Sequence, residues 1–512
     1  MTQGEIEKLT VKVSNIFSEL EVRIMTDIVR RIKENGFASA SVDWQISRLQ
    51  QLGMAEEDIR GWIQSALQAT DTEMDRIFSD EVYKQYYEQE HFFKLAGMQQ
   101  IPLEENFVLQ QLIEATKKQL QGEYQNLTGS MGFAIRNPVT GRIQSSPLMD
   151  YYRSTMDQAV IDIKSGAFDY NTVLKRTVNQ MTASGLRYIE YDSGHRDRID
   201  VAARRAILTG FRQVQSQIME QVAEQLGTDL YEVSYHVGAR PTHQPWQGKV
   251  WTRQELVSVC GLGEITGLKG INCYHDYKPF PPGAKRTYTD EQLQEMLEAE
   301  NTPKEYNGKQ YTTYEALQQQ RKMERGMRAQ RQKIKLLQEG GADEQEIILA
   351  KAKYQGQMQT YKDFSEKMKL PEQKARIMQD GLKGKFMPTK AEQKALEESA
   401  INDKIKADMK AVGLRGEINL KPQIPDVSKL SFDEHHVNQE RQHNVTEAEA
   451  KSYIQNAVFS TTKWKGKFTN YYSDEGAAFV DNEAQHIKTA FKKEQYDEAA
   501  TAAMEVLKHG RS

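Results

Sequence analysis

The first part of the chain has the residue spacing of amphipathic helices. Branched aliphatic residues recur every three or four positions, at Leu9, Val13, Ile16, Leu20, Ile24 and Ile28. This spacing places them along one side of a helix. A second helix is expected from Ser41, its N-cap, to Gly53, its stop, and a third over EEDIRGWIQSAL.

Two later segments interrupt this helical pattern. Residues 129–147 are rich in Gly, Pro and Ser, which predicts a loop or a short hairpin. Helical spacing resumes at Tyr151 and ends in a long helix over residues 199–227. From Asp229 to about Gly283 apolar and polar residues alternate between turn residues, so we expect strands and turns there.

Residues 303–420 differ from both patterns because they are rich in Gln, Lys, Glu, Arg and Met. Apolar residues are too sparse here for a separate core, so we expect long solvated helices or a partly disordered tether. Within residues 321–335 one acid, Glu324, stands among the basic residues Arg321, Lys322, Arg325, Arg328, Arg331, Lys333 and Lys335. We interpret the run as a solvated helix face; the alternative is that Arg321, Arg325 and Arg328 bind the phosphates of DNA or RNA.

The end of the chain has the pattern of a small α+β domain. Two prolines in LKPQIPDVSKL mark a linker, and a helix, strand-like runs and a final helix follow. The predicted fold class is therefore mainly α with α+β modules. Its parts are helical regions 1–128 and 129–228, a β-rich module 229–290, a charged tether 291–425 and an α+β domain 426–512.

Composition narrows the class of protein. The 512 residues include 68 basic and 72 acidic side chains, which argues against a general nucleic-acid coat but allows local basic patches. Two cysteines cannot form a disulfide framework, which is typical of a reducing compartment. We find no signal peptide and no run of 18 apolar residues, so no membrane association is expected.

Unusual chemistry is concentrated between His236 and Pro282, in the segments HVGARPTHQPWQGKVW and GLKGINCYHDYKPFPPG. Imidazole and thiolate are ligands that zinc prefers, so His243, Cys273 and His275 could bind this metal. His236 or Asp276 could supply a fourth ligand. The alternative is a metal-free β-rich core, held together by Trp246 and by hydrogen-bonded histidines. No cofactor other than zinc is expected.

The same two segments resemble the phage minor capsid protein 2 family, which is related to the head-morphogenesis proteins typified by phage Mu protein F. The residues that carry the resemblance follow the family order: Gly238, Ala239, Arg240, Pro241, His243, Trp246, Gly248, Gly270, Asn272, Cys273, His275, Pro279 and Pro282. It extends, with a weaker signal, over about residues 1–290. The triplet Cys-Tyr-His at Cys273 fits the minor capsid subgroup, whereas related Mu-type proteins have Cys-x-Cys.

This resemblance implies a low-copy structural protein of a tailed phage or prophage. Such a protein is made in the host cytoplasm and assembles at the portal vertex of the prohead. Its partners would be the portal protein and other head proteins, with phage DNA or host RNA as further candidates. The N-terminal helices would dock on the portal, unless their apolar stripe is buried in an internal core.

The last 80 residues contain groups suited to phosphodiester chemistry. His436, Arg441 and His443 lie on or near one short helix, and histidine can act as both base and acid near neutral pH. Arg441 and a hydroxyl, from Thr489 or Ser460, could stabilise the charge that builds on phosphorus. Further candidates for stacking on bases or contacting phosphates are Trp464, Tyr471, Tyr472, Lys463, Lys465 and Lys467.

The order of these motifs resembles the phage-borne nuclease-like domains of the barnase–EndoU–colicin–RelE superfold. The resemblance implies a metal-independent ribonuclease in which His436, Arg441, His443 and Thr489 are catalytic. The alternative is a non-catalytic domain with helix-capping histidines and ordinary strand tyrosines. Three functions stay open: a minor head protein with a C-terminal effector, a packaged toxin-like ribonuclease, and a non-viral scaffold that binds nucleic acid through residues 321–335.

Overall fold

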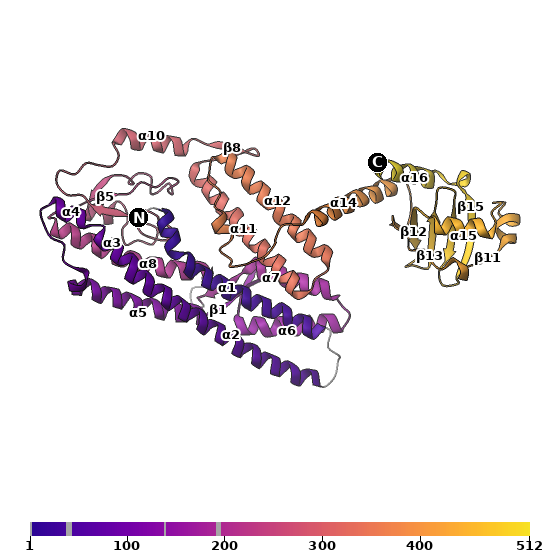
Figure 1. Cartoon of the computed structure of the whole chain (residues 1–512), viewed down its shortest axis with the longest axis horizontal. Coiled ribbons are helices and arrows are strands. Elements are labelled where there is room, and N and C mark those ends of the chain that lie inside the picture. The colour runs from indigo at the N-terminus through magenta and orange to yellow at the C-terminus, as the bar shows by residue number, and fades with distance from the viewer. Residues whose placement is uncertain (1–2, 37–42, 138–139, 191–195, 512) are drawn as a thin grey trace. The chain divides into compact units, whose positions relative to one another are not determined.

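The computed structural model describes residues 3–36, 43–137, 140–190 and 196–511 (Figure 1). The chain divides into two compact units, Met1–Pro388 and Thr389–Ser512. The predicted fold class is confirmed, since long helices dominate and several small sheets accompany them. Ser41, the expected N-cap, lies outside the described residues.

Long helices build most of the first unit, and α1 lies among them (Figure 1). It packs against α8, α11, α2 and α6. The long helices are α1 (Gln3–Gly36), α2 (Asp43–Arg76), α5 (Phe107–Gly129), α6 (Leu148–Lys164), α7 (Tyr170–Ser184), α8 (Ile199–Gln225), α11 (Thr313–Gly340) and α12 (Glu344–Met368). Short turns η1 (Ile77–Glu81), α3 (Val82–Tyr87), α4 (Glu90–Leu95) and η2 (Leu103–Glu105) connect α2 to α5.

The apolar stripe of α1 is buried inside this unit. Val13, Ile24 and Ile28 are fully buried, and Ile16 packs against the same core from a half-buried position. The stripe therefore forms an internal core, and the expectation that it docks on a portal is wrong. Gly53 also does not end a helix, because α2 runs through it without a break.

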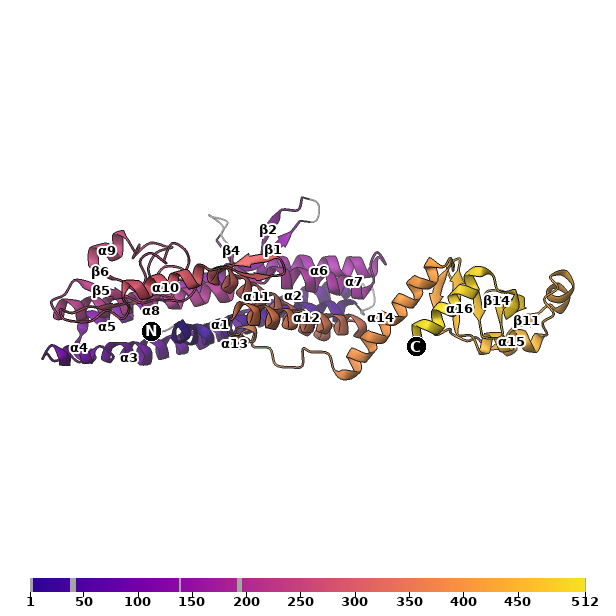
Figure 2. The same ribbon diagram turned by 90° about the horizontal axis from the view of Figure 1, so that it is seen from above.

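Residues 129–147, predicted as a loop or a short hairpin, form a hairpin. Strands β1 (Met131–Arg136) and β2 (Ile143–Pro147) pair antiparallel and extend away from the helices (Figure 2). With β3 (Leu186–Ile189) and β4 (Arg196–Arg198) they form a sheet of order β2-β1-β3-β4. A Cβ atom at Gly132 would lie 2.2 Å from the carbonyl oxygen of Ser146, so the hairpin requires glycine at this position.

The predicted strands and turns after Asp229 are confirmed. Strands β5 (Leu230–Val233), β6 (Val250–Thr252) and β7 (Tyr277–Pro279) form an antiparallel sheet of order β6-β5-β7. Helix α9 (Arg253–Ser258) follows β6, and α10 (Asp290–Asn301) and the hairpin of β8 (Lys304–Tyr306) and β9 (Lys309–Tyr311) lead into α11. Helix α8 packs on β7, so the small sheet rests on the helical body.

The expectation that residues 303–420 form solvated helices or a tether is wrong as far as Pro388. Helix α11 begins with a capping box between Thr312 and Glu315 and packs against α12, α1 and α7. Met327 and Ile334 are completely buried, and the short helix α13 (Lys374–Ile377) packs on the same helix. The apolar residues of α11 are too few for a core of their own, but they complete the core that α1 and α7 begin.

Several charged residues of α11 face inward, which contradicts a solvated basic face. The guanidinium of Arg331 binds Asp380 at 2.7 Å and lies over the ring of Phe386. Arg328 approaches Asp200 of α8 at 3.6 Å, and its side chain is only 20% exposed. A helix with few apolar residues is thus anchored by ion pairs to acids that lie far away in the sequence.

The second unit is built on one mixed sheet. Its strands are β10 (Glu417–Asn419), β11 (Ser431–Phe432), β12 (Phe459–Lys463), β13 (Phe468–Tyr472), β14 (Gly476–Asp481) and β15 (His486–Lys492), in the order β10-β12-β13-β14-β15-β11. The expected strands and final helix are present, while the expected first helix is divided into a π-helical turn, η4 (His436–Glu440), and α15 (Glu447–Gln455).

Two small cores stabilise this unit. One contains residues of α14 (Lys390–Ala411), β12, β14 and α16 (Glu498–Arg511), including Met409 and Leu507. The other contains Val437 of η4, Ile454 of α15 and Ile487 of β15. Since α14 and β10 contribute to the first core, the folded unit begins well before residue 426.

Candidate functional site

Most motif residues of the first unit lie in two loops, one between β5 and β6 and one between α9 and β7. His243 lies between β5 and β6, and Cys273 and His275 lie just before β7. Arg212 of α8 holds the second loop, because its guanidinium donates to the carbonyl oxygens of Lys269 and Gly270 at 3.0 Å each and also to that of Cys273. The helix that carries the sheet therefore also fixes the backbone of the loop.

The turn before Cys273 depends on unusual backbone geometry. Lys269 and Asn272 both have positive φ angles, 60° and 56°. A Cβ atom at Gly270 would lie 2.4 Å from the carbonyl oxygen of Ile265, a distance that no side chain tolerates. The glycine and asparagine of the motif thus permit the tight turn that directs Cys273 inward.

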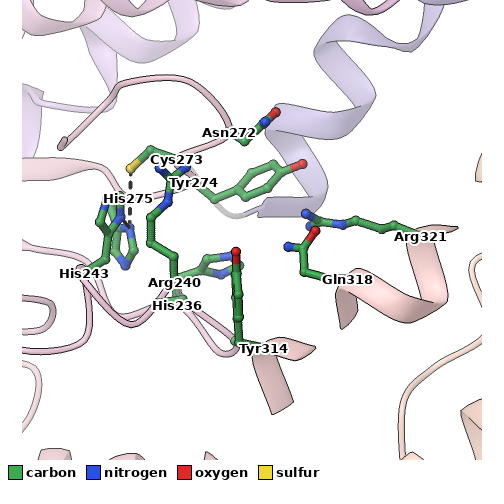
Figure 3. Close-up of a pocket in the computed structure, with 12 residues that line it drawn as sticks. His236, Arg240, His243, Asn272, Cys273, Tyr274, His275, Tyr314, Gln318 and Arg321 are labelled. Carbon is green, nitrogen blue, oxygen red and sulfur yellow. Dashed lines mark hydrogen bonds between the residues drawn. The ribbon is translucent and has the colours of Figure 1, made fainter. Parts of the chain in front are cut away.

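The structure brings the three predicted zinc ligands together. One ligand atom from each of His243, Cys273 and His275 lies within 4.8 Å of the others, and each residue is 2% exposed (Figure 3). The Nδ1 atoms of the two histidines are 3.4 Å apart. The Sγ atom of Cys273 lies 3.4 Å from Nδ1 of His275.

The opposite ring nitrogens make hydrogen bonds to oxygen atoms. Nε2 of His243 lies 2.8 Å from the carbonyl oxygen of Thr266, and Nε2 of His275 lies 2.9 Å from Oε1 of Gln247. Arg240 donates to the same Thr266 oxygen at 3.3 Å and to that of Ile271 at 2.5 Å. These bonds fix the two rings and tie the two loops together.

Two further motif residues shape the surroundings. The Trp246 ring, which is 4% exposed, lies 4.5 Å from the ring of His243 and 4.8 Å from that of His275, measured between centroids. Gly248 has φ of 71°, and a Cβ atom there would lie 2.5 Å from a methyl carbon of Leu293. The motif thus provides an aromatic wall and close packing against α10.

Burial keeps the histidines neutral. It lowers the pKa of His275 to about 2 and that of His236 to about 4, with neighbouring positive groups adding to both shifts. Burial also raises the pKa of the Cys273 thiol, while the charge of Arg212 and backbone N–H groups partly offset the rise. Without a positive centre, the cluster therefore holds uncharged rings and a thiol.

The two expected fourth ligands are placed differently. The carboxylate of Asp276 binds the ammonium of Lys269 at 3.1 Å and the amide of Gln215 at 2.8 Å, so it is not a ligand of the cluster. The ring of His236 lies 5.6 Å from that of His275, between centroids, and lines a neighbouring cavity. Sequence reasoning did not single out Arg212, Gln247 or Lys269: Gln247 lies within the quoted motif between Trp246 and Gly248, but as a glutamine it does not suggest a ligand contact, and Arg212 and Lys269 are of common residue types.

The cavity beside the cluster has a volume of about 270 Å³ (Figure 3). The cluster residues line it together with polar side chains of both loops and of α11, namely His236, Arg240, Asn272, Tyr274, Tyr314, Gln318 and Arg321. The guanidinium of Arg321 lies over the Tyr274 ring, 5.6 Å from its centroid. Of the three arginines expected to bind nucleic acid, Arg321 therefore faces this cavity, Arg328 faces Asp200 and Arg325 is exposed.

In the second unit the structure brings His436 and Arg441 together. Nδ1 of His436 lies 2.6 Å from a carboxylate oxygen of Glu440, and Nε2 accepts a hydrogen bond of 3.1 Å from Nε of Arg441. Only the Nδ1–H tautomer satisfies both bonds, because the guanidinium can only donate. A carboxylate, an imidazole and a guanidinium thus form an exposed chain on and beside η4.

The other two expected catalytic residues lie apart from this chain. His443 makes a hydrogen bond of 3.3 Å with Gln495, and its ring lies 5.5 Å from that of Phe491. Thr489 is buried in β15, and its hydroxyl has no hydrogen-bond partner among the described residues. Within the described part of the chain, no hydrogen bond joins His443 or Thr489 to His436.

The expected base-stacking surface is largely wrong. Tyr471 and Tyr472 are 4% and 6% exposed and belong to the two cores of this unit, so neither ring can meet a base. Ser460 is also buried. Trp464 is 78% exposed in the turn between β12 and β13, where Lys463 is half-buried, Lys465 is exposed and Lys467 pairs with Glu483. Trp464 therefore keeps an exposed aromatic ring beside basic side chains.

The family comparison identifies the class of protein as a structural protein of the phage head. Residues 1–366 match the family model described as phage minor capsid protein 2. Since the match covers well over half of the 512 residues, the chain belongs to this family. Searches of curated proteins and of solved structures return no match.

Family membership places the protein in the virion, with other phage head proteins as its partners. It replaces the alternative of a non-viral scaffold. Among the described residues, no helix has the length and hydropathy needed to cross a membrane.

Proposed function

We propose that the first unit is built into the phage head at the portal vertex and that the second unit is carried there as a separately folded effector. The observation that carries this proposal is the extent of the family match. The match ends at residue 366, close to the end of α12, and the compact unit Thr389–Ser512 lies wholly outside it. A shared head module with an appended domain accounts for both facts.

The segment between α4 and the start of α5 is the surface that we assign to contact with a head protein. Four large apolar side chains are exposed within eleven residues: Met98 (45%), Ile101 (45%), Phe107 (73%) and Val108 (64%). Exposed apolar side chains gathered in one short segment are typical of protein–protein contact sites. The stripe of α1 cannot serve this purpose because it is buried.

Quantitative mass spectrometry of purified virions tests the location. We expect a few copies per particle and chemical cross-links to the portal protein. The double variant Phe107→Asp/Val108→Asp should be lost from virions, whereas Ile161→Asp, at a 59% exposed apolar position on α6, should be retained. Hundreds of copies spread over the capsid shell would contradict the portal location, and retention of the double variant would contradict the docking surface.

A second candidate function, ribonuclease activity of the second unit, is favoured by the exposed chain Glu440–His436–Arg441. Glu440 holds the Nδ1–H group of His436, which leaves Nε2 as the base for a ribose hydroxyl. In the absence of RNA, Arg441 hydrogen-bonds to this nitrogen. With RNA bound, its guanidinium would instead contact the phosphate and stabilise its negative charge. His443 is the candidate acid for the leaving oxygen.

Incubation of residues 389–512 with transfer RNA tests this activity. This fragment contains α14 and both cores, unlike a fragment that begins at residue 426. Substituting alanine for His436, Arg441 or His443 should each reduce cleavage by about 10²- to 10⁴-fold. His509→Ala is the matched control, since this exposed histidine lies near the end of α16. Failure of the wild type to cleave, or equal cleavage by His436→Ala, would exclude the ribonuclease.

A further inference from the structure

The protonation of the two clustered histidines follows from their outer contacts. The carbonyl oxygen of Thr266 can only accept, so Nε2 of His243 must carry the proton. Oε1 of Gln247 accepts the backbone N–H of His236 at 3.0 Å, which fixes the orientation of this amide. The same oxygen therefore also accepts from Nε2 of His275.

Both Nδ1 atoms are consequently unprotonated in the neutral rings. They nevertheless face each other at 3.4 Å in a buried site, with two lone pairs directed at the same space. The thiol proton of Cys273 can satisfy only one of them. A buried acceptor without a donor costs free energy, and a positive centre between these atoms would remove that cost.

Two separations within the cluster match a tetrahedral zinc ion. Zinc binds nitrogen at about 2.0–2.1 Å and sulfur at about 2.3 Å, so tetrahedral angles separate two nitrogen ligands by ~3.4 Å and nitrogen from sulfur by ~3.6 Å. The Nδ1 atoms of His243 and His275 are 3.4 Å apart, and Sγ of Cys273 lies 3.4 Å from the second of them. We propose that these three atoms bind one Zn²⁺ ion, with water in the fourth position.

The surroundings have the features of a built metal site. Each ligating histidine donates its other N–H to an oxygen, which orients the ring and strengthens it as a ligand. The guanidinium of Arg212 binds the carbonyl oxygen of Cys273, which places a positive charge close to the thiolate that zinc requires. The three ligands also line the polar cavity beside them, so a water molecule can reach the fourth position.

The ion would join the loop that follows β5 to the loop that precedes β7. Arg240 and the hydrogen bond between Gln247 and His275 already join these loops. Zinc would thus stabilise the module itself. This role is independent of the portal location and of ribonuclease activity.

Elemental analysis of the full-length protein, purified without chelator, tests the proposal. We expect one zinc per chain in the wild type and at least a tenfold lower content in Cys273→Ser and His243→Gln. Cys260→Ser is the matched control, because Cys260 is equally buried, lies outside the cluster, and should leave the zinc content at one.

Cobalt substitution of the wild type provides a test that does not depend on variants that fold. Replacing zinc by Co²⁺ should give the visible bands of a tetrahedral ion and a thiolate-to-cobalt charge-transfer band, and Cys260→Ser should give the same spectrum. A wild-type protein that contains no zinc and takes up neither Zn²⁺ nor Co²⁺ would overturn the proposal. Equal zinc content in folded Cys273→Ser and wild type would also overturn it, because the ion would then lie elsewhere.

Discussion

Replacing Asp380 by alanine tests whether the segment after α12 is a packed part of the first unit. The carboxylate of Asp380 is 1% exposed and the guanidinium of Arg331 is 7% exposed. Two hydrogen bonds join them, at 2.7 and 3.2 Å. The substitution leaves the guanidinium buried without its counter-charge, which costs about 3–5 kcal/mol of unfolding free energy.

Urea unfolding followed by circular dichroism measures this loss. With a dependence on urea of about 3 kcal/mol per M, the midpoint of the first unit should fall by roughly 1–2 M. Glu372→Ala is the control: its partner, Lys374, is 59% exposed, and such pairs contribute about 1 kcal/mol or less. The double variant Arg331→Met/Asp380→Leu should recover much of the stability, because it leaves no buried charge unpaired.

A loss below about 1 kcal/mol in Asp380→Ala would refute this reasoning, since it would mean that the ion pair is exposed to solvent in solution. A double variant as unstable as Asp380→Ala would instead show that the loss does not come from an unpaired charge.

Three further predictions concern both units. Glu21→Ala should destabilise the first unit by about 3–5 kcal/mol in urea unfolding, because the 1% exposed carboxylate binds an arginine and a backbone N–H; equal midpoints would contradict this. Gly238→Ala should lower the melting temperature measured by calorimetry, because φ is 72° and the new Cβ would lie 2.2 Å from a methyl carbon of Leu317; an unchanged value would refute the clash. Residues 389–512 should unfold cooperatively in denaturant while 426–512 should not, and a cooperative shorter fragment would show that α14 is dispensable.

The sequence predicted those features that depend on neighbouring residues. The hairpin over residues 129–147 and the strands after Asp229 follow from local turn chemistry and alternation, and the structure has both. The cluster of His243, Cys273 and His275 was predicted from residue types alone, because few other side chains in the segment can bind a metal.

Features that depend on distant partners were not predictable in this way. Helix α11 has few apolar residues, so only its contacts with α1 and α7 reveal that it belongs to a core. Asp276 carries a carboxylate that could bind a metal, but this carboxylate forms an ion pair with Lys269 of the same loop. Tyr471 and Tyr472 are adjacent on a strand whose two faces both pack against helices, so both are buried, whereas alternation alone would expose one of them.

The contact between α1 and α11 also determines when the first unit can complete its fold during synthesis. The side chain of Gln332 binds that of Glu21, a partner translated 311 residues earlier. At about 5–20 residues per second, the ribosome needs on the order of 15–60 s to bridge this interval. Nascent chains must keep their first apolar helix out of aggregates for that time, and products truncated before residue 313 should be substrates for chaperones and proteases.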